Sequence, residues 1–239
     1  MSAPRFFCSL PLAADREIPL DPTAASHATR VLRLGVGAPL TLFDGRGGEY
    51  PATLVALAGG RVTARTGAHL AREAEPAFAI VLGQALAKGE RMDLVVQKAV
   101  ELGATQVQPL ATARSEVHLD AERAAKRVAH WQGVVKAACE QSGRNRLPEV
   151  RPPLGLAAWL DSPAAPLRIV LAADGAPLAA LARPTAGIAL LVGPEGGLAP
   201  EELALADGAG FRRTSLGPRV LRTETASIAA LGAIQALWG

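Results

Sequence analysis

The hydrophobic pattern divides the chain into a β-rich first part and a second part in which strands alternate with helices. In the first part, short apolar runs lie at 39–43, 49–57 and 61–66. Asp44-Gly45 and Gly59-Gly60 separate these runs, and such dipeptides favour tight hairpin turns. We therefore expect a small barrel or meander of short strands.

A helix is expected before these strands, over residues 21–34. Its spacing would bring His27, Arg30 and Arg33 close to one face. Residues 67–76 are polar and charged and end in proline, so we place the domain boundary in this stretch. The predicted domains are residues 1–72 and 73–239.

In the second part, the apolar pattern alternates between the strand period and the helix period. Strands are expected at 78–82, 106–110, 168–173, 188–192 and 214–216, the first four as buried strands. A helix is expected where Met92, Val95, Val96, Ala99 and Val100 repeat at helical spacing, with Gly103 after its end. Further helices are expected over 120–141, capped by Asp120, from Pro200 with Glu201 and Glu202 in its first turn, and over 223–238. This alternation predicts a mostly parallel sheet with helices on both faces.

Two loops in the last third of the chain carry the strongest functional signal. They are Leu190–Leu198 (LLVGPEGGL) and Leu216–Ala226 (LGPRVLRTETA), and each sets glycine and proline beside an apolar run. Because both follow predicted strands, they should meet at the carboxyl edge of the sheet, where ligands bind in such folds. We expect a pocket built largely from main chain; the alternative is a tight turn without a ligand.

A phosphate cradle is the main alternative ligand site, and the sequence disfavours it. Neither the dinucleotide fingerprint nor the Walker pattern is present. Glu195 lies in the middle of the first loop, and its carboxylate would repel a pyrophosphate. A neutral or cationic ligand suits the loop better.

Composition adds a basic bias without a metal site. The net charge is only +3, but the basic residues are mostly arginine, with lysine only at Lys88, Lys98, Lys126 and Lys136. Arginine suits phosphate and base contacts, although a GC-rich genome would produce the same bias. The two cysteines and four histidines fit no metal spacing, and Cys139 is expected to be a buried free thiol. Because no long apolar segment is present, near the amino terminus or elsewhere, we expect a cytoplasmic protein without membrane association.

Five blocks of the chain resemble the RsmE family, bacterial 16S rRNA uridine N3-methyltransferases of the SPOUT superfamily. They are HATRVLRL at 27–34, KGERMDLVVQKAVELG at 88–103, residues 131–150 with AACEQSGRNRLPEV, and the two loops above. The resemblance implies an α/β fold: a SPOUT-type parallel-sheet domain with a C-terminal trefoil knot, preceded by a small PUA-like β-barrel domain. The usual absence of knots would not have suggested this topology.

The resemblance also implies the ligands and partners. S-adenosyl-L-methionine would lie in the knot against three loops, the protein would be a homodimer, and its substrate would be 16S rRNA of the small ribosomal subunit. The cofactor-binding residues implied are Ala172, Ala173, Gly193, Pro194, Glu195, Gly196, Gly197, Leu216, Gly217, Val220 and Leu221. In one departure, Ala199 stands where family members often have a capping serine, a loss of about 1 kcal/mol that Pro200 and the two glutamates would partly offset.

Methylation at N3 of uracil requires removal of a weakly acidic proton, so a base or an anion stabiliser is needed. By position after the second loop, Arg222 is predicted to stabilise the developing anion and Glu224 to accept the proton. Glu195 is a weaker candidate. Alternatively, Arg222 and Glu224 form a structural ion pair.

Arginine, lysine and histidine side chains are predicted to contact RNA, with an ordinary solvated surface as the alternative. These residues are His27, Arg30, Arg33, Lys88, Arg91, Arg114, Arg144 and Arg146. Two other functions stay open at this point: a related knotted methyltransferase acting on ribose 2′-hydroxyls or on tRNA, and a non-catalytic RNA-binding or ribosome-assembly factor. Binding of S-adenosylmethionine would exclude the non-catalytic factor.

Overall fold

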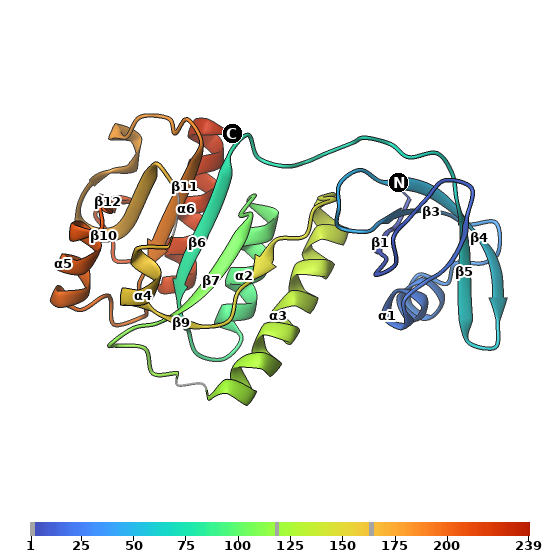
Figure 1. Cartoon of the computed structure of the whole chain (residues 1–239), viewed down its shortest axis with the longest axis horizontal. Coiled ribbons are helices and arrows are strands. Elements are labelled where there is room, and N and C mark those ends of the chain that lie inside the picture. The colour runs from blue at the N-terminus through green and yellow to red at the C-terminus, as the bar shows by residue number, and fades with distance from the viewer. Residues whose placement is uncertain (1–2, 118–119, 163–164) are drawn as a thin grey trace. The chain divides into compact units, whose positions relative to one another are not determined.

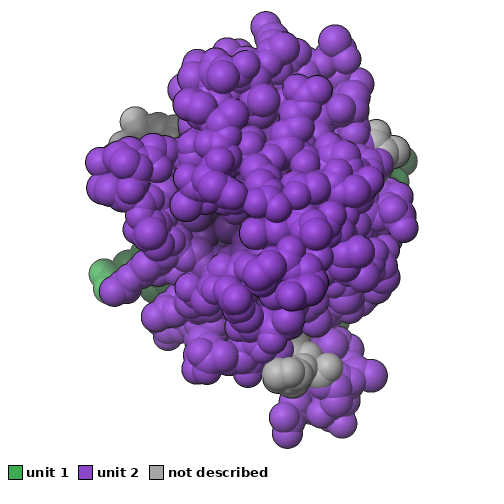
Figure 2. All heavy atoms as spheres, turned by 90° about the vertical axis from the view of Figure 1, so that its left-hand side faces the viewer, with its two compact units in different colours: residues 1–75, 139–147 green, residues 76–138, 148–239 purple. Residues whose placement is uncertain are grey.

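The computed structural model describes residues 3–117, 120–162 and 165–239, and the chain forms two compact units (Figures 1 and 2). Unit 1 contains residues 1–75 together with 139–147, and unit 2 contains residues 76–138 and 148–239. The sequence placed a boundary between residues 72 and 73 but did not anticipate that a later segment belongs to the first unit.

Unit 1 is built on a five-stranded sheet. Its strands are β1 (Arg5–Phe7), β2 (Glu17–Pro19), β3 (Pro39–Phe43), β4 (Tyr50–Ala58) and β5 (Arg61–Thr66), in the order β1-β3-β4-β5-β2. The pairing is antiparallel except between β1 and β3. Gly59 and Gly60 have φ of +56° and +79°, as a two-residue hairpin turn of the favoured twist requires. The three predicted strands and this turn are confirmed, whereas β1 and β2 were not predicted.

The predicted helix over 21–34 is shorter and less regular than the sequence indicated. An α-helix, α1 (Pro22–Ser26), continues into a π-helical turn over His27–Val31. Leu32 then ends the turn and Arg33 takes a left-handed φ of +53°. The prediction of one continuous helix to residue 34 is therefore wrong at its C-terminal end. π-Helical turns are rare and occur frequently at functional sites.

The polar interior of unit 1 is completed by residues 139–147. Arg5 forms an ion pair with Glu49, which is only 7% exposed, and also donates a 2.6 Å hydrogen bond to Oδ1 of Asn145. Asn145 in turn donates to the carbonyl of Arg72, whose guanidinium lies 3.2 Å from Glu49. Buried charges need such partners, since an unpaired one costs several kcal/mol.

We predict that acid weakens unit 1 through Glu49. Burial by itself raises the pKa of Glu49, but the hydrogen bonds and charges of Arg5 and Arg72 outweigh burial and hold that pKa below its ordinary value of 4.5. The stabilisation is therefore complete above about pH 4.5 and is lost as the pH falls through the lower pKa of the folded protein. Urea unfolding followed between pH 6 and pH 2 should show this decline, and Glu49→Gln should remove its contribution.

Unit 2 contains a parallel sheet in the order β12-β10-β11-β6-β7-β8, with the short β9 also paired to β7. The strands are β6 (Ala79–Ala85), β7 (Gln106–Ala111), β8 (Glu149–Val150), β9 (Leu154–Gly155), β10 (Leu167–Pro177), β11 (Gly187–Val192) and β12 (Arg212–Ser215). Every residue of the central strand β11 is buried, as its continuous apolar run predicts. The predicted parallel sheet is confirmed.

Helices cover both faces of this sheet (Figure 1). The helices are α2 (Arg91–Glu101), α3 (Ala121–Ser142), α4 (Leu156–Leu160), α5 (Pro200–Gly208) and α6 (Thr223–Trp238), with a 3₁₀ turn at Leu178–Ala180. α4 and α5 pack against one face through Trp159, Leu160 and Ala206. The buried side of α2 is the predicted one, and Gly103 follows it with φ of +85°. In the described part of the chain, no helix has the length and apolar character needed to span a membrane.

Candidate functional site

An interruption in strand β10 opens a pocket in unit 2. β10 pairs with β12 at Leu171 and again at Ala176, both opposite Thr214, so the intervening residues 172–175 leave the ladder as a bulge. Gly175 permits this because its backbone lies against β12: a Cβ there would be 2.3 Å from the nitrogen of Thr214. The bulge therefore depends on glycine at this position.

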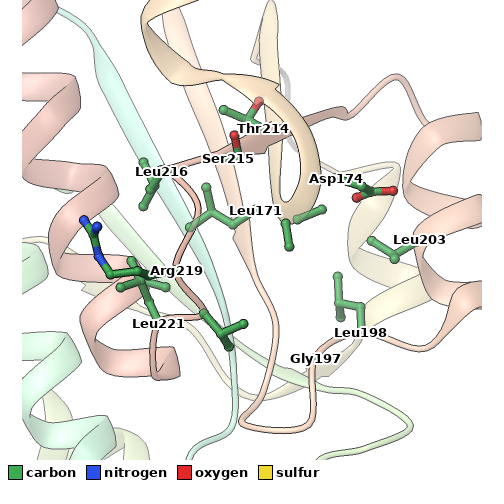
Figure 3. Close-up of a pocket in the computed structure, with 15 residues that line it drawn as sticks. Leu171, Asp174, Gly197, Leu198, Leu203, Thr214, Ser215, Leu216, Arg219 and Leu221 are labelled. Atoms are coloured by element: carbon green, nitrogen blue, oxygen red, sulfur yellow. The ribbon is translucent and has the colours of Figure 1, made fainter.

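The pocket has a volume of about 280 Å³, near the lower end of the range for small-molecule sites. Its walls come from the β10 bulge, the end of the first predicted loop, α5 and the second predicted loop, and Figure 3 shows these residues around the cavity. The lining residues are Leu171, Ala172, Ala173, Asp174, Gly197, Leu198, Leu203, Thr214, Ser215, Leu216, Gly217, Arg219, Val220, Leu221 and Ala226. Leucine side chains and main chain dominate, so the cavity suits a ligand with an apolar body and a few polar groups.

The structure brings together part of the predicted cofactor set. Ala172, Ala173, Gly197, Leu216, Gly217, Val220 and Leu221 line the cavity. Gly193, Pro194, Glu195 and Gly196 do not line it and instead form the preceding part of the same loop. Asp174, which lines the pocket, was not predicted; its carboxylate accepts a 2.9 Å hydrogen bond from Arg213.

We predict that Gly175→Ala weakens both the pocket and the fold of unit 2. The new methyl group would meet the main chain of β12 and force β10 and β12 apart, which costs about 1–3 kcal/mol. Thermal unfolding and ligand titration would measure both effects. Gly208→Ala is the matched control, because no described atom outside the backbone of its own helix lies within 4 Å of a Cβ at position 208. Equal behaviour of the two variants would contradict the role given to the bulge.

A buried polar network joins the first loop to the start of α6. Oγ1 of Thr223 donates a 2.6 Å hydrogen bond to the carbonyl of Gly193 and accepts one of 2.9 Å from Nε2 of Gln84 on β6. Ser227 lies within hydrogen-bond distance of Oε1 of Gln84. This network, which was not predicted from the sequence, fixes the loop to the helix. The sequence holds two features that indicate such a network. Gln84 lies within an otherwise apolar strand, and Thr223 and Ser227 are hydroxyl residues one helical turn apart in α6.

Arg222 and Glu224 lie at the N-terminus of α6, just beyond the pocket-lining loop. Arg222 is the exposed N-cap residue, and Glu224 is in the first turn. Oε2 of Glu224 is buried and has no hydrogen-bond partner among the described residues. Within the described chain, no ion pair joins Arg222 to Glu224, so the alternative of a structural ion pair is not found. Glu224 thus keeps an acceptor oxygen without a protein partner.

Three of the predicted RNA-binding residues gather around the first loop. Nη1 of Arg91 lies 2.7 Å from Glu195, and Nη1 of Arg114 donates a 2.8 Å hydrogen bond to the carbonyl of Gly196. Lys88 forms an ion pair with Glu116. Burial alone raises the pKa of Glu195, but hydrogen bonds from its own backbone amide, Arg91 and the Lys88 amide outweigh burial and lower it. Glu195 is therefore an ionised partner of the basic residues.

The predicted RNA-binding residues of unit 1 have different environments. His27, Arg30, Arg33 and Arg146 are exposed, and Arg146 lies 3.6 Å from Glu73. Arg144 is only 3% exposed and forms an ion pair with Glu75. Its predicted role as a surface contact is corrected: the side chain lies inside unit 1 because a carboxylate from a distant part of the sequence pairs with it.

Cys8 and Cys139 are buried free thiols, as predicted for Cys139, and burial raises the pKa of Cys139 to about 12. α5 begins at Pro200 as predicted. Where the sequence lacks a capping serine at Ala199, the Glu202 carboxylate accepts a 2.9 Å hydrogen bond from the Ala199 amide. In the described ranges, no group of three or more acidic, histidine or cysteine side chains could hold a metal ion.

Two protein families match the chain in tandem. Residues 73–235 match the family described as RNA methyltransferase domain, and residues 20–66 match the RNA methyltransferase PUA domain. The first match alone covers more than half of the sequence.

Similar proteins and solved structures agree with these matches. The ribosomal RNA small subunit methyltransferase E of Synechocystis is 36% identical over 223 residues, covering 90% of this chain and 72% of the relative. A solved structure of that enzyme from Neisseria gonorrhoeae, bound to S-adenosyl methionine, has a TM-score of 0.92 and 39% identity over 100% of this chain and 99% of the other. A Legionella pneumophila methyltransferase in complex with the same cofactor has a TM-score of 0.94 and 38% identity, covering 99% and 98%.

Proposed function

The chain belongs to the ribosomal RNA small subunit methyltransferase E family, and on this premise we propose that it transfers a methyl group from S-adenosyl-L-methionine to N3 of a uridine in 16S rRNA. The observation that carries the proposal is the pocket between the β10 bulge and the two glycine loops, in a chain whose similar structures are bound to this cofactor. When bound, S-adenosylmethionine supplies an electrophilic methyl group.

The residues of the pocket fit this cofactor. Leu198, Leu203 and Leu216 would hold the apolar part of the cofactor, and the main chain of the loops would supply donors and acceptors for its polar groups. The carboxylates nearby, Asp174 and Glu195, oppose a pyrophosphate but not a sulfonium cation. Each carboxylate is paired with an arginine, Asp174 with Arg213 and Glu195 with Arg91.

The catalytic groups proposed for uracil are Glu224 and Arg222. Oε2 of Glu224 is buried and has no hydrogen-bond partner among the described residues, so it can accept the N3 proton directly or through water. Arg222 is exposed at the start of the same helix, where its cation can stabilise negative charge developing on a uracil oxygen. Orientation of the base in line with the methyl group would supply much of the remaining rate enhancement.

Finer features of the fold and assembly are also proposed from family membership. They are a C-terminal trefoil knot, a PUA-like barrel in the first domain, a homodimer, and action in the cytoplasm. A knot is consistent with the meeting of residues 197–198 and 214–221 at one pocket. The functional domains 1–72 and 73–239 likewise remain a proposal, distinct from the two compact units.

We predict a salt-dependent affinity for RNA, with contacts from exposed or half-buried basic residues of both units. They are His27, Arg30, Arg33 and Arg146 in unit 1 and Lys88 and Arg91 in unit 2. Log affinity should fall linearly with log salt, with a slope of about 0.7–0.9 per neutralised phosphate. Filter binding to a 16S rRNA fragment would measure this slope, and Arg30→Ala should reduce it. An affinity independent of salt would contradict a phosphate-binding surface.

The decisive experiment is methyl transfer to small ribosomal subunits from a strain that lacks this enzyme, followed by nucleoside mass spectrometry. The expected product is 3-methyluridine. A ribose-methylated nucleoside would instead assign the protein to 2′-hydroxyl chemistry. Absence of product with cofactor binding retained would indicate another RNA substrate, and absence of cofactor binding would indicate a non-catalytic factor.

A further inference from the structure

Two loops of unit 2 are joined by hydrogen bonds that involve the side chains of Glu202 and Arg114. One loop follows β7 and contains residues 112–116; the other is the cofactor loop, residues 193–199. Glu202, in the first turn of α5, accepts a 2.8 Å hydrogen bond from the amide of Ala113 through Oε1. Through Oε2 it accepts a 2.9 Å hydrogen bond from the amide of Ala199. One carboxylate therefore binds the main chain of both loops.

Arg114 makes the return contact. Its Nη1 donates to the carbonyl of Gly196 at 2.8 Å and lies 3.5 Å from the carbonyl of Leu198. Its aliphatic stem also lies close to Gly196, since a Cβ added to that glycine would be 3.5 Å from Cβ of Arg114. We call the pair Arg114 and Glu202 the clasp.

The clasp acts on the part of the loop that lines the pocket. Gly197 and Leu198 line the pocket, and the clasp binds the residues on either side of them, Gly196 and Ala199, as well as the carbonyl of Leu198. Gly197 has φ of +68°, which is one of several conformations open to glycine. Hydrogen bonds to the residues beside it therefore help to hold the loop in this shape. A loop whose shape is fixed before binding loses less entropy when the ligand arrives.

We propose that Arg114 and Glu202 are positioning residues that set the affinity of the pocket for S-adenosylmethionine. Arg114 thus acts on the cofactor side, which differs from its sequence-based prediction as an RNA contact. The proposal rests on the proposed function in one respect, that the ligand of this pocket is S-adenosylmethionine. Neither residue lines the cavity, so the effect passes through the loop.

The test is calorimetric titration of the full-length protein with S-adenosylmethionine, without RNA. Glu202→Gln keeps the size of the side chain but leaves one acceptor oxygen where two are used, so the dissociation constant should rise about tenfold. Glu201→Gln, at the exposed neighbouring position in the same first turn, is the matched control and should bind like the wild type. Arg114→Ala should weaken binding similarly, and the double variant should lose less than the product of the two single effects, because the residues act on one loop.

Kinetics separate positioning from a general loss of structure. For Glu202→Gln, KM for S-adenosylmethionine should rise while kcat at saturating cofactor stays within about twofold of wild type. The melting temperature should fall by no more than about 2–4 °C, since one helix-capping contact is lost. A fall of kcat in step with a fall in melting temperature would overturn the proposal, as would Arg114→Ala that weakens RNA binding but not cofactor binding. Unaltered affinity in Glu202→Gln overturns the clasp alone, whereas a wild-type protein that does not bind the cofactor overturns the proposed function as well.

Discussion

Replacing Glu224 by glutamine should lower turnover by about 10²–10⁴-fold, the usual contribution of a general base. Glutamine has nearly the same shape but cannot accept the N3 proton. Because Glu224 does not line the pocket, affinity for S-adenosylmethionine should stay within about twofold. Single-turnover methyl transfer to small subunits, together with cofactor titration, would measure both quantities.

The control for this experiment is Glu201→Gln, which also replaces a first-turn acid of a helix in unit 2. It should leave turnover unchanged. Raising the pH should partly restore Glu224→Gln, because ionised uracil no longer needs a base. Unchanged turnover in Glu224→Gln would remove this residue as the proton acceptor.

Replacing Glu49 by glutamine should lower the free energy of unfolding by about 3–5 kcal/mol, because it leaves the cation of Arg5 buried without its partner. The side chains of Arg5 and Glu49 are only 12% and 9% exposed, so water cannot solvate the guanidinium that is left without its carboxylate. Urea denaturation at pH 7 would measure the change.

Glu17→Gln provides the comparison, since Glu17 pairs with Arg65 at 2.6 Å in the same unit but on its surface, with 55% and 61% of the side chains exposed. An exposed pair contributes about 0–1 kcal/mol. If both variants lost the same small amount, the network around Glu49 would not be important for the stability of unit 1.

Most of the regular elements of this fold are predictable because their signals are local. In the helix that contains Met92 and Val100, the apolar residues recur at helical spacing, and Gly103 follows its end. The strand at 61–66 follows the Gly59-Gly60 turn, where glycine takes the positive φ that a two-residue hairpin requires without steric cost. The two ligand loops also follow strands directly, and residues of both line the pocket.

What the sequence could not predict depends on partners distant along the chain. Arg144 is predicted to lie on the surface, yet it is buried, because Glu75 pairs with it. The bulge at 172–175 depends on contact between Gly175 and β12, which follows much later in the sequence. After the first helix, Arg33 takes a left-handed φ of +53°, which an arginine in the sequence does not indicate. None of these three features produces a periodic pattern in the neighbouring sequence.

The return of residues 139–147 into unit 1 has a consequence for synthesis on the ribosome. Domains generally fold in the order in which they emerge, at about 5–20 residues per second. Here the first 75 residues emerge without Asn145 and Arg144, which complete their polar interior, and residues 76–138 must be translated first. During that interval of several seconds, Arg5, Glu49 and Glu75 lack part of their final partners. The amino-terminal unit is therefore the first to be synthesised but cannot be completed until the middle of the chain has been made.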